Sequence, residues 1–268
     1  MGRRLTGDMD APQNNGLFTI TKLMRRFFFR PEERIGEMVV LPEGESHHIR
    51  SVLRLHSGQH VELFDGAGGV HLAELVDLSG KVRARIVSST IDREGVGTPL
   101  WVGQGLLKGK NMDTVVQKCT ELGASALLPL MTSRCQGRPD LIRDGKKHER
   151  WLRIVEEACK QCGRTRPMEL LETTDFQDII ESSGTGPAGL KILFWEEERD
   201  VYLHDLLPFQ GLDTVQILLG PEGGFTKEEV AMAKDAGWRT VSLGKRILRA
   251  ETATLASVAI LQHLLGAM

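Results

Sequence analysis

The sequence lacks the features that would place the protein in a membrane or outside the cell. No apolar stretch approaches the ~18 residues that a membrane-spanning helix needs. Residues 1–23 contain neither a continuous apolar segment nor a convincing cleavage site, which argues against a secretion signal. We therefore predict a cytoplasmic protein with no membrane partner, and we interpret residues 1–23 as a loose N-terminal extension.

Cysteine is scarce, with four in 268 residues, and the arrangement of these four argues against a metal site. Cys159 and Cys162 have the C-x-x-C spacing of some zinc and redox sites. Cys119 and Cys135 form no matching pair, and no histidine cluster completes a set of four ligands. The segment around the C-x-x-C also has helical periodicity. We therefore predict free thiols near a helix end and no metal cofactor, with a zinc or redox site as the alternative.

A large excess of positive charge is also missing, because the formal net charge is −2. Hydrophobic residues at 41% and charged residues at 26% are typical of a globular protein. Basic residues nevertheless gather locally, as in "MRRFFFR" (24–30), "HHIRSVLRLH" (47–56) and "RDGKKHER" (143–150). Such patches on a nearly neutral chain are compatible with binding a structured polyanion through one face, and ordinary surface charge explains any single patch equally well.

Residues 24–93 have the pattern of a small β domain. Short apolar segments are separated by Gly, Pro or Asp-Gly turns such as "DGAGG" (65–69), which predicts several short strands in a compact barrel or sandwich. Phe27 and Phe29 fit a strand that buries alternate residues, and stacking of Phe27 to Phe29 on nucleic acid bases is an equal alternative. Residues 92–99 have the composition of a linker.

Residues 97–268 alternate between strand and helix patterns, which predicts an α/β domain with a mostly parallel sheet. Asn111 or Asp113 can cap the first helix, and Thr226 with Glu229 fits a capping box. Strands are expected at 125–131, 191–195, 214–219 and 238–244, and helices at 111–123, 151–162, after 226 and at 251–266.

The first unusual loop of this domain is "LGPEGGF" (Leu219 to Phe225), at the end of a predicted strand. It matches neither phosphate-binding glycine pattern, and Glu222 would repel a pyrophosphate. Its glycines let the backbone approach a ligand closely, while Pro221 stiffens the turn. The loop therefore suits a compact nucleoside that carries a cationic group, such as S-adenosylmethionine (SAM). A plain tight turn is the alternative.

The second loop is "LGKRILRAETA" (Leu243 to Ala253), which leads into an apolar helix. Arg249 offers a planar fork of donors for a carbonyl, carboxylate or phosphate. Glu251 in the first turn favours the helix dipole, and Thr252 and Thr254 supply hydroxyl groups. An ordinary charged helix start explains Glu251, but it does not explain the arginine in an apolar context.

Together these two loops closely resemble the SAM-binding loops of the bacterial 16S rRNA uridine-N3 methyltransferases of the SPOUT class. Further motifs agree with this resemblance, among them "HHIRSVLRLHSGQHVELFDGAGG" (47–69), "KGKNMDTVVQKCTELGASALLPLMTSRC" (108–135) and "EEACKQCGR" (156–164). The likeness runs from about Met24 to the C-terminus. Residues 1–23 lie outside it.

The resemblance implies a two-domain architecture. It predicts a PUA-like β-barrel at residues 24–93 that helps to hold RNA, followed at 97–268 by a SPOUT domain with a deep trefoil knot. It also implies a homodimer, with substrate reaching across the interface, and 16S rRNA within the assembled small ribosomal subunit as the partner. Alternatives are a SPOUT methyltransferase for another RNA or position, such as a tRNA ribose, and a catalytically inactive RNA-binding assembly factor.

The resemblance also implies which residues line the SAM site. The set combines the two loops with the end of an earlier strand: Phe194, Trp195, Glu196, Leu219, Gly220, Pro221, Glu222, Gly223, Gly224, Leu243, Leu248, Arg249, Ala250, Glu251, Thr252 and Ala253.

Methylation of a uridine at N3 requires removal of a weakly acidic imide proton. We expect Arg249 to stabilise negative charge on a uracil carbonyl and Glu251 or Glu222 to accept the proton. Glu222 can instead be structural, with its carboxylate bound to backbone N–H groups of its own loop. Basic side chains are expected to contact RNA phosphates, and these are Arg25, Arg26, Arg50, Arg54, Lys108, Lys110 and Arg134.

Overall fold

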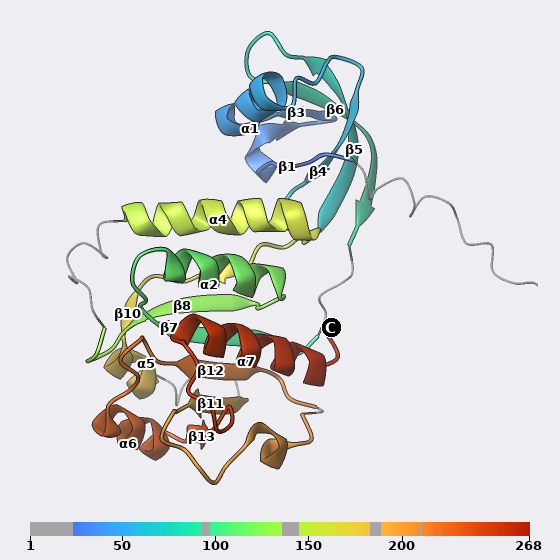
Figure 1. The fold of residues 1–268 in the computed structure, drawn as a ribbon. Coiled ribbons are helices and arrows are strands. Elements are labelled where there is room, and N and C mark those ends of the chain that lie inside the picture. The colour runs from blue at the N-terminus through green and yellow to red at the C-terminus, as the bar shows by residue number, and fades with distance from the viewer. Residues whose placement is uncertain (1–23, 93–96, 136–144, 183–188, 210) are drawn as a thin grey trace, which may run out of the picture. The chain divides into compact units, whose positions relative to one another are not determined.

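The protein is described by a computed structural model that covers residues 24–92, 97–135, 145–182, 189–209 and 211–268 (Figure 1). The chain forms two compact units. The first contains the residues up to Phe64 together with Val70–Thr90, and the second contains Asp65–Gly69 and Ile91–Met268. The predicted extension at 1–23 and half of the predicted linker, residues 93–96, lie outside the described residues.

The first unit is built on a six-stranded sheet in the order β1-β4-β5-β6-β3-β2. β1 runs parallel to β4, while β4 with β5, β3 with β6 and β2 with β3 are antiparallel. The strands are β1 (Arg26–Phe28), β2 (Arg34–Ile35), β3 (Met38–Val40), β4 (His60–Phe64), β5 (Gly69–Asp77) and β6 (Arg83–Ile91).

The core of the first unit decides between the two predictions for Phe27 and Phe29, which were burial in a strand and stacking on bases. Phe27 and Phe29 are each 1% exposed and belong to one apolar cluster with Ile49 and Val61. A strand that buries alternate residues is therefore confirmed, and these two rings do not stack on bases. A short 3-10 turn covers Pro31–Glu33.

One helical segment of the first unit was absent from the sequence prediction. α1 (Glu43–His47) continues into a π-helical turn at His48–Val52. Pro42 is the N-cap of α1, and Ile49 is buried in the core of the first unit. Only two of its ten residues are buried, so the spacing of its apolar residues is too weak a signal to predict a helix.

The second unit contains a seven-stranded sheet, and all of its paired strands are parallel. This confirms the predicted α/β domain. The sheet order is β10-β8-β7-β12-β11-β13, with β9 paired to β8. The strands are β7 (Leu100–Gly105), β8 (Ala126–Met131), β9 (Glu169–Leu170), β10 (Thr174–Asp175), β11 (Leu190–Phe194), β12 (Val215–Leu219) and β13 (Arg239–Val241).

Helices pack on this sheet through two sets of contacts (Figure 1). α5 and α6 contribute Phe176 and Val230 to a cluster that includes Leu193 and Leu218 of the sheet. α7 packs against β7 and β12, and α2 packs against both α4 and α7. The helices are α2 (Lys110–Glu121), α4 (Lys146–Cys162), α5 (Phe176–Ser182), α6 (Lys227–Asp235) and α7 (Ala250–Leu264), with a 3-10 turn at Leu203–Leu206.

The helix starts divide into one correct prediction and one error. The capping box of α6 is confirmed, because Glu229 N–H donates to Thr226 Oγ1 (3.1 Å) and Thr226 N–H donates to Glu229 Oε2 (2.8 Å). The predicted side-chain cap of α2 is wrong. Its N-cap is Gly109 at φ +56°, a conformation that favours glycine. Asp113 instead accepts a hydrogen bond from Trp151 of α4 (3.2 Å).

Candidate functional site

The site lies where four neighbouring parallel strands end. β7, β12, β11 and β13 are adjacent in the sheet. Their register places Gln104 beside Leu219, Leu219 beside Phe194, and Phe194 beside Val241. The loops that leave these strands consequently begin along one edge, which is where α/β sheets bind ligands.

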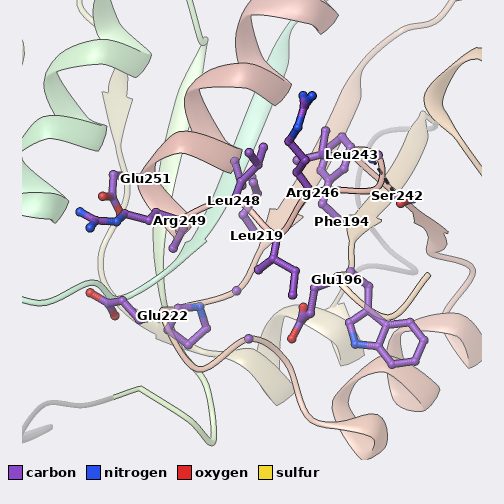
Figure 2. Close-up of a pocket in the computed structure, with 18 of the residues that line it drawn as sticks. Phe194, Glu196, Leu219, Glu222, Ser242, Leu243, Arg246, Leu248, Arg249 and Glu251 are labelled. Carbon is purple, nitrogen blue, oxygen red and sulfur yellow. Dashed lines mark hydrogen bonds between the residues drawn. The ribbon is translucent and has the colours of Figure 1, made fainter. Parts of the chain in front are cut away.

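A cavity of about 550 Å³ opens at this edge (Figure 2). Its volume falls within the range of small-molecule sites. Fourteen of the predicted cofactor residues line it: Phe194, Trp195, Glu196, Leu219, Gly220, Pro221, Glu222, Gly224, Leu243, Leu248, Arg249, Ala250, Glu251 and Ala253. Gly223 and Thr252, also predicted, lie outside the lining. The sequence prediction missed Asn111, Arg199, Ser242, Gly244, Arg246 and Ile247.

The first loop owes its shape to backbone freedom and to supports from neighbouring strands. Gly224 has φ +68°, and its N–H donates to Pro221 O (2.9 Å). The positive φ favours glycine there, and a Cβ at Gly224 would also displace the carboxylate of Glu196. The Arg134 guanidinium donates from Nη1 to Gly223 O (2.9 Å) and Phe225 O (3.2 Å), which fixes the far side of the loop.

Glu222 is held by a different segment from the one expected. Its Oε1 accepts a hydrogen bond from the backbone N–H of Lys108 (2.9 Å), which lies between β7 and α2. The predicted bond to its own loop is therefore replaced by a link across the site. Sequence reasoning could not find this contact, because 114 residues separate its two partners.

The second loop delivers Arg249 and Glu251 to the cavity at the start of α7. Arg249 is the N-cap of α7, with extended backbone angles, and its carbonyl accepts from Ala253 N–H (2.8 Å). Gly244 has φ +112°, and its N–H donates to Ser242 Oγ (3.3 Å). Figure 2 draws Arg249, Glu251 and Glu222 toward one end of the cavity and Glu196 toward the other.

The segment after β11 also lines the cavity, and a buried carboxylate holds it in shape. Glu198 is 9% exposed, and its Oε1 accepts from the backbone N–H groups of Arg199 (3.0 Å) and Asp200 (3.1 Å). Its Oε2 accepts from Thr240 Oγ1 (2.6 Å). Burial raises the pKa of Glu198, but hydrogen bonds from Thr240 and from the backbone outweigh burial, so its pKa lies below its ordinary value.

The charges of the cavity are balanced. Among the described residues its acidic lining is Glu196, Glu222 and Glu251, and its basic lining is Arg199, Arg246 and Arg249. A polyphosphate site would need a clear excess of positive charge. Three carboxylates together with three guanidinium groups instead fit a ligand that carries charges of both signs.

Comparison with known proteins identifies the family. Residues 96–262 match an RNA methyltransferase domain family and residues 41–87 match an RNA methyltransferase PUA domain family. The ribosomal RNA small subunit methyltransferase E of Synechocystis is 34% identical over 90% of this chain and 78% of its own length. The chain belongs to the ribosomal RNA small subunit methyltransferase E family.

Solved structures of similar proteins support the same family assignment. The methyltransferase E of Neisseria gonorrhoeae, bound to SAM, is 34% identical, covers 90% of this chain and 98% of its own, and has a TM-score of 0.79. A methyltransferase of Legionella pneumophila in complex with SAM is 31% identical over 90% of this chain and 97% of its own, with a TM-score of 0.82. The predicted family and its PUA-like first domain are thus confirmed.

The family assignment makes the positions of the seven predicted RNA contacts informative. In the first unit Arg25 and Arg54 are exposed, and Arg54 has φ +53°. The other two arginines predicted as RNA contacts in that unit form ion pairs. Arg26 pairs with Glu62 (2.5 Å) and is only 13% exposed at its side chain, and Arg50 pairs with Glu43 (3.2 Å).

In the methyltransferase domain the three predicted RNA contacts divide in the same way. Lys108 and Lys110 are exposed, at the turn that leads into α2. Arg134 is exposed as well, but its guanidinium donates to carbonyls of the first loop. These two hydrogen bonds support the first loop.

The cysteines form no disulfide, and the described part of the chain shows no cluster of metal-ligating side chains. Burial raises the pKa of Cys119 to about 12, so this thiol stays neutral. Cys159 is buried and Cys162 is exposed at the end of α4, close to the predicted position. Within the described ranges, no helix is both long and apolar enough to span a membrane.

Proposed function

We propose that this chain is a SAM-dependent methyltransferase that modifies N3 of a uridine in the 16S rRNA of the small ribosomal subunit. The observation that carries this proposal is the charge-balanced cavity formed by the two glycine-containing loops. SAM combines a positive sulfonium and ammonium with a carboxylate, so its charges suit such a lining. Relatives that are 34% and 31% identical bind SAM in their solved structures.

The chain's own residues supply positioning and charge. SAM supplies the methyl group when it is bound. The segments after β11, β12 and β13 would hold SAM. Their glycines leave backbone groups accessible to the bound SAM. Arg249 stands at the mouth of the cavity, exposed and ahead of the α7 N-terminus. Its guanidinium is placed to stabilise negative charge on a uracil carbonyl.

The hydrogen bonds of the two acids favour Glu251 as the proton acceptor. Glu222 already accepts from Lys108 N–H through Oε1. Glu251 lines the cavity, and no side-chain hydrogen bond of its carboxylate is found among the described residues. A carboxylate with open lone pairs can take the imide proton of uridine, while Glu222 holds its loop.

The proposal extends to the assembly. We infer a homodimer in the cytoplasm, with the deep trefoil knot that the family resemblance implies. α7 exposes Ile260 and Leu264 at 44% and 37%, which supplies apolar surface for a second copy. The substrate we propose is rRNA in the assembled subunit, held in part by the exposed cations Arg25, Arg54, Lys108 and Lys110.

Transfer of label from SAM tests the substrate. Small ribosomal subunits that lack the modification, and free 16S rRNA, are each incubated with the enzyme and labelled SAM. We expect label in the subunits and much less in the free RNA. Label in tRNA supplied in a parallel reaction, with none in the subunits or the free 16S rRNA, would contradict the proposal, and no calorimetric uptake of SAM would indicate an inactive binding protein.

A further inference from the structure

A buried amide of β7 bonds the first loop of the cavity and α7, the helix into which the second loop leads. Gln104, in β7, is 0% exposed. Its Nε2 donates to Gly105 O (2.9 Å) and to Gly220 O (3.1 Å), and Gly220 opens the first loop. Its Oε1 accepts from the hydroxyl of Thr254, which lies in the first turns of α7 just beyond the second loop.

The orientation of this amide follows from its partners. Both carbonyl groups can only accept a hydrogen bond, so the nitrogen of Gln104 must face them and the oxygen must face Thr254. Thr254 is also 0% exposed, and its Oγ1 lies 2.9 Å from Ala250 O. Every polar group in this network is satisfied without water from the cavity.

The backbone beside the network is closely packed. A Cβ at Gly105 would lie 2.5 Å from Pro221 N, so the end of β7 is packed directly against the first loop. Neither Gln104 nor Thr254 lines the cavity. They join segments that are 116 and 150 residues apart in the sequence.

We propose that Gln104, acting through Gly220 O and Thr254, is a positioning residue that sets the distance between the two loops of the methyl-donor site. This inference rests on the proposed function for its ligand, SAM. It assigns no chemical step to Gln104. Removing either end of the amide's contacts leaves buried polar groups unpaired, and the loops relax away from the geometry that binds the donor.

The chain offers a matched control for this proposal. Thr120 in α2 is also 0% exposed, and its Oγ1 donates to Val116 O four residues earlier (2.8 Å). It therefore repeats the local environment of Thr254 but has no bond to Gln104 and no place at the cavity. Thr254→Val and Thr120→Val remove the same hydroxyl from the same kind of helical position.

The experiment measures SAM affinity by calorimetry for Gln104→Met, Thr254→Val, Thr254→Ser and Thr120→Val. We expect Gln104→Met and Thr254→Val to bind SAM about tenfold more weakly. Thr254→Ser, which keeps the hydroxyl, and Thr120→Val should bind within about twofold of the wild type. Unchanged affinity in the first two variants, or an equal loss in Thr120→Val, would overturn the proposal.

Hydrogen exchange without ligand separates this inference from the proposed function. Amides in Gly220–Phe225, including the bonded Gly224 N–H, should exchange faster in Gln104→Met and Thr254→Val than in Thr120→Val. If the wild type takes up no SAM, the proposed function fails, and this comparison alone decides the role of Gln104. Equal exchange in all variants contradicts that role.

Discussion

Arg249 is the side chain on which the proposed chemistry depends most directly. It is exposed at the mouth of the cavity, and the α7 backbone begins immediately after it. We expect Arg249→Ala to lower turnover by about 10²–10³-fold, because stabilisation of developing negative charge is lost, while SAM affinity changes little. Single-turnover kinetics and calorimetry measure the two effects. Arg239→Ala, an exposed arginine outside the cavity, is the control. Near-normal turnover in Arg249→Ala would contradict the role of Arg249 in stabilising negative charge.

Glu251 and Glu222 are two acids at the same cavity with different surroundings. Glu222 is bonded to Lys108 N–H, and Glu251 is open. We expect Glu251→Gln to reduce turnover by about 10²-fold and to remove the acidic limb of the pH–rate profile. Glu222→Gln keeps an oxygen that can accept from Lys108, so its profile should match that of the wild type. The reverse pattern would make Glu222 the proton acceptor.

Single residues were predictable where a loop pattern named them, and unpredictable where a distant segment decided their role. The sequence placed Gly224 and Arg249 at the cavity because both belong to the loop motifs. It could not place Arg199 there, since this residue has no local signal, and it did not select Arg246 although this residue lies in the second loop. It also gave no sign that Arg134, predicted as an RNA contact, donates hydrogen bonds to carbonyls of the first loop.

The first loop depends on supports from the elements beside it, which gives a paired test. Arg134→Ala removes two hydrogen bonds to that loop, so we expect weaker SAM binding and an unchanged salt dependence of RNA binding. Lys110→Ala changes an exposed cation at the start of α2 and should lower the salt slope by about one, with SAM affinity intact. Affinities over a salt series and calorimetry with SAM measure these effects. If Arg134→Ala lowers the slope of RNA affinity against salt concentration, Arg134 contacts RNA and this expectation is wrong.

The segment after β11 depends on the ionised form of Glu198. Its folded pKa lies below the ordinary value of 4.5, so its stabilising contribution is full above that pH and is lost as pH falls through the folded pKa. Glu198→Gln should therefore lower the free energy of unfolding at pH 7 by about 1–2 kcal/mol, and the difference should shrink below pH ~4. Urea unfolding at pH 7 and pH 4 measures this. Glu197→Gln, at a more exposed carboxyl, is the control. A difference that does not change with pH would contradict this account.

Helices and strands were predictable in proportion to their periodicity. α4 buries Trp151, Val155 and Cys159 at helical spacing, and β12 is an apolar run that ends at a glycine loop. The segment at 43–52 buries only two residues, so its helical form had no comparable signal. The cap of α2 failed for another reason, because Asp113 serves a contact with α4 that lies 38 residues away.

For the complete chain, the order of the strands in the sheet was beyond sequence reasoning. The sequence predicted strands and a parallel sheet, but not that β7 lies beside both β8 and β12. That order brings the four loops of the cavity together and places Gln104 behind them. Pairings across more than 100 residues leave no trace in local patterns, so the loops were found and the network that connects them was not.

Methylation of small ribosomal subunits followed by nucleoside mass spectrometry tests the central claim most directly. The subunits are prepared without the modification and treated with the wild type or with Arg249→Ala in the presence of labelled SAM. The account predicts labelled N3-methyluridine in 16S rRNA with the wild type and almost none with the variant. Label in any other nucleoside, or a product that forms equally well with Arg249→Ala, would contradict it.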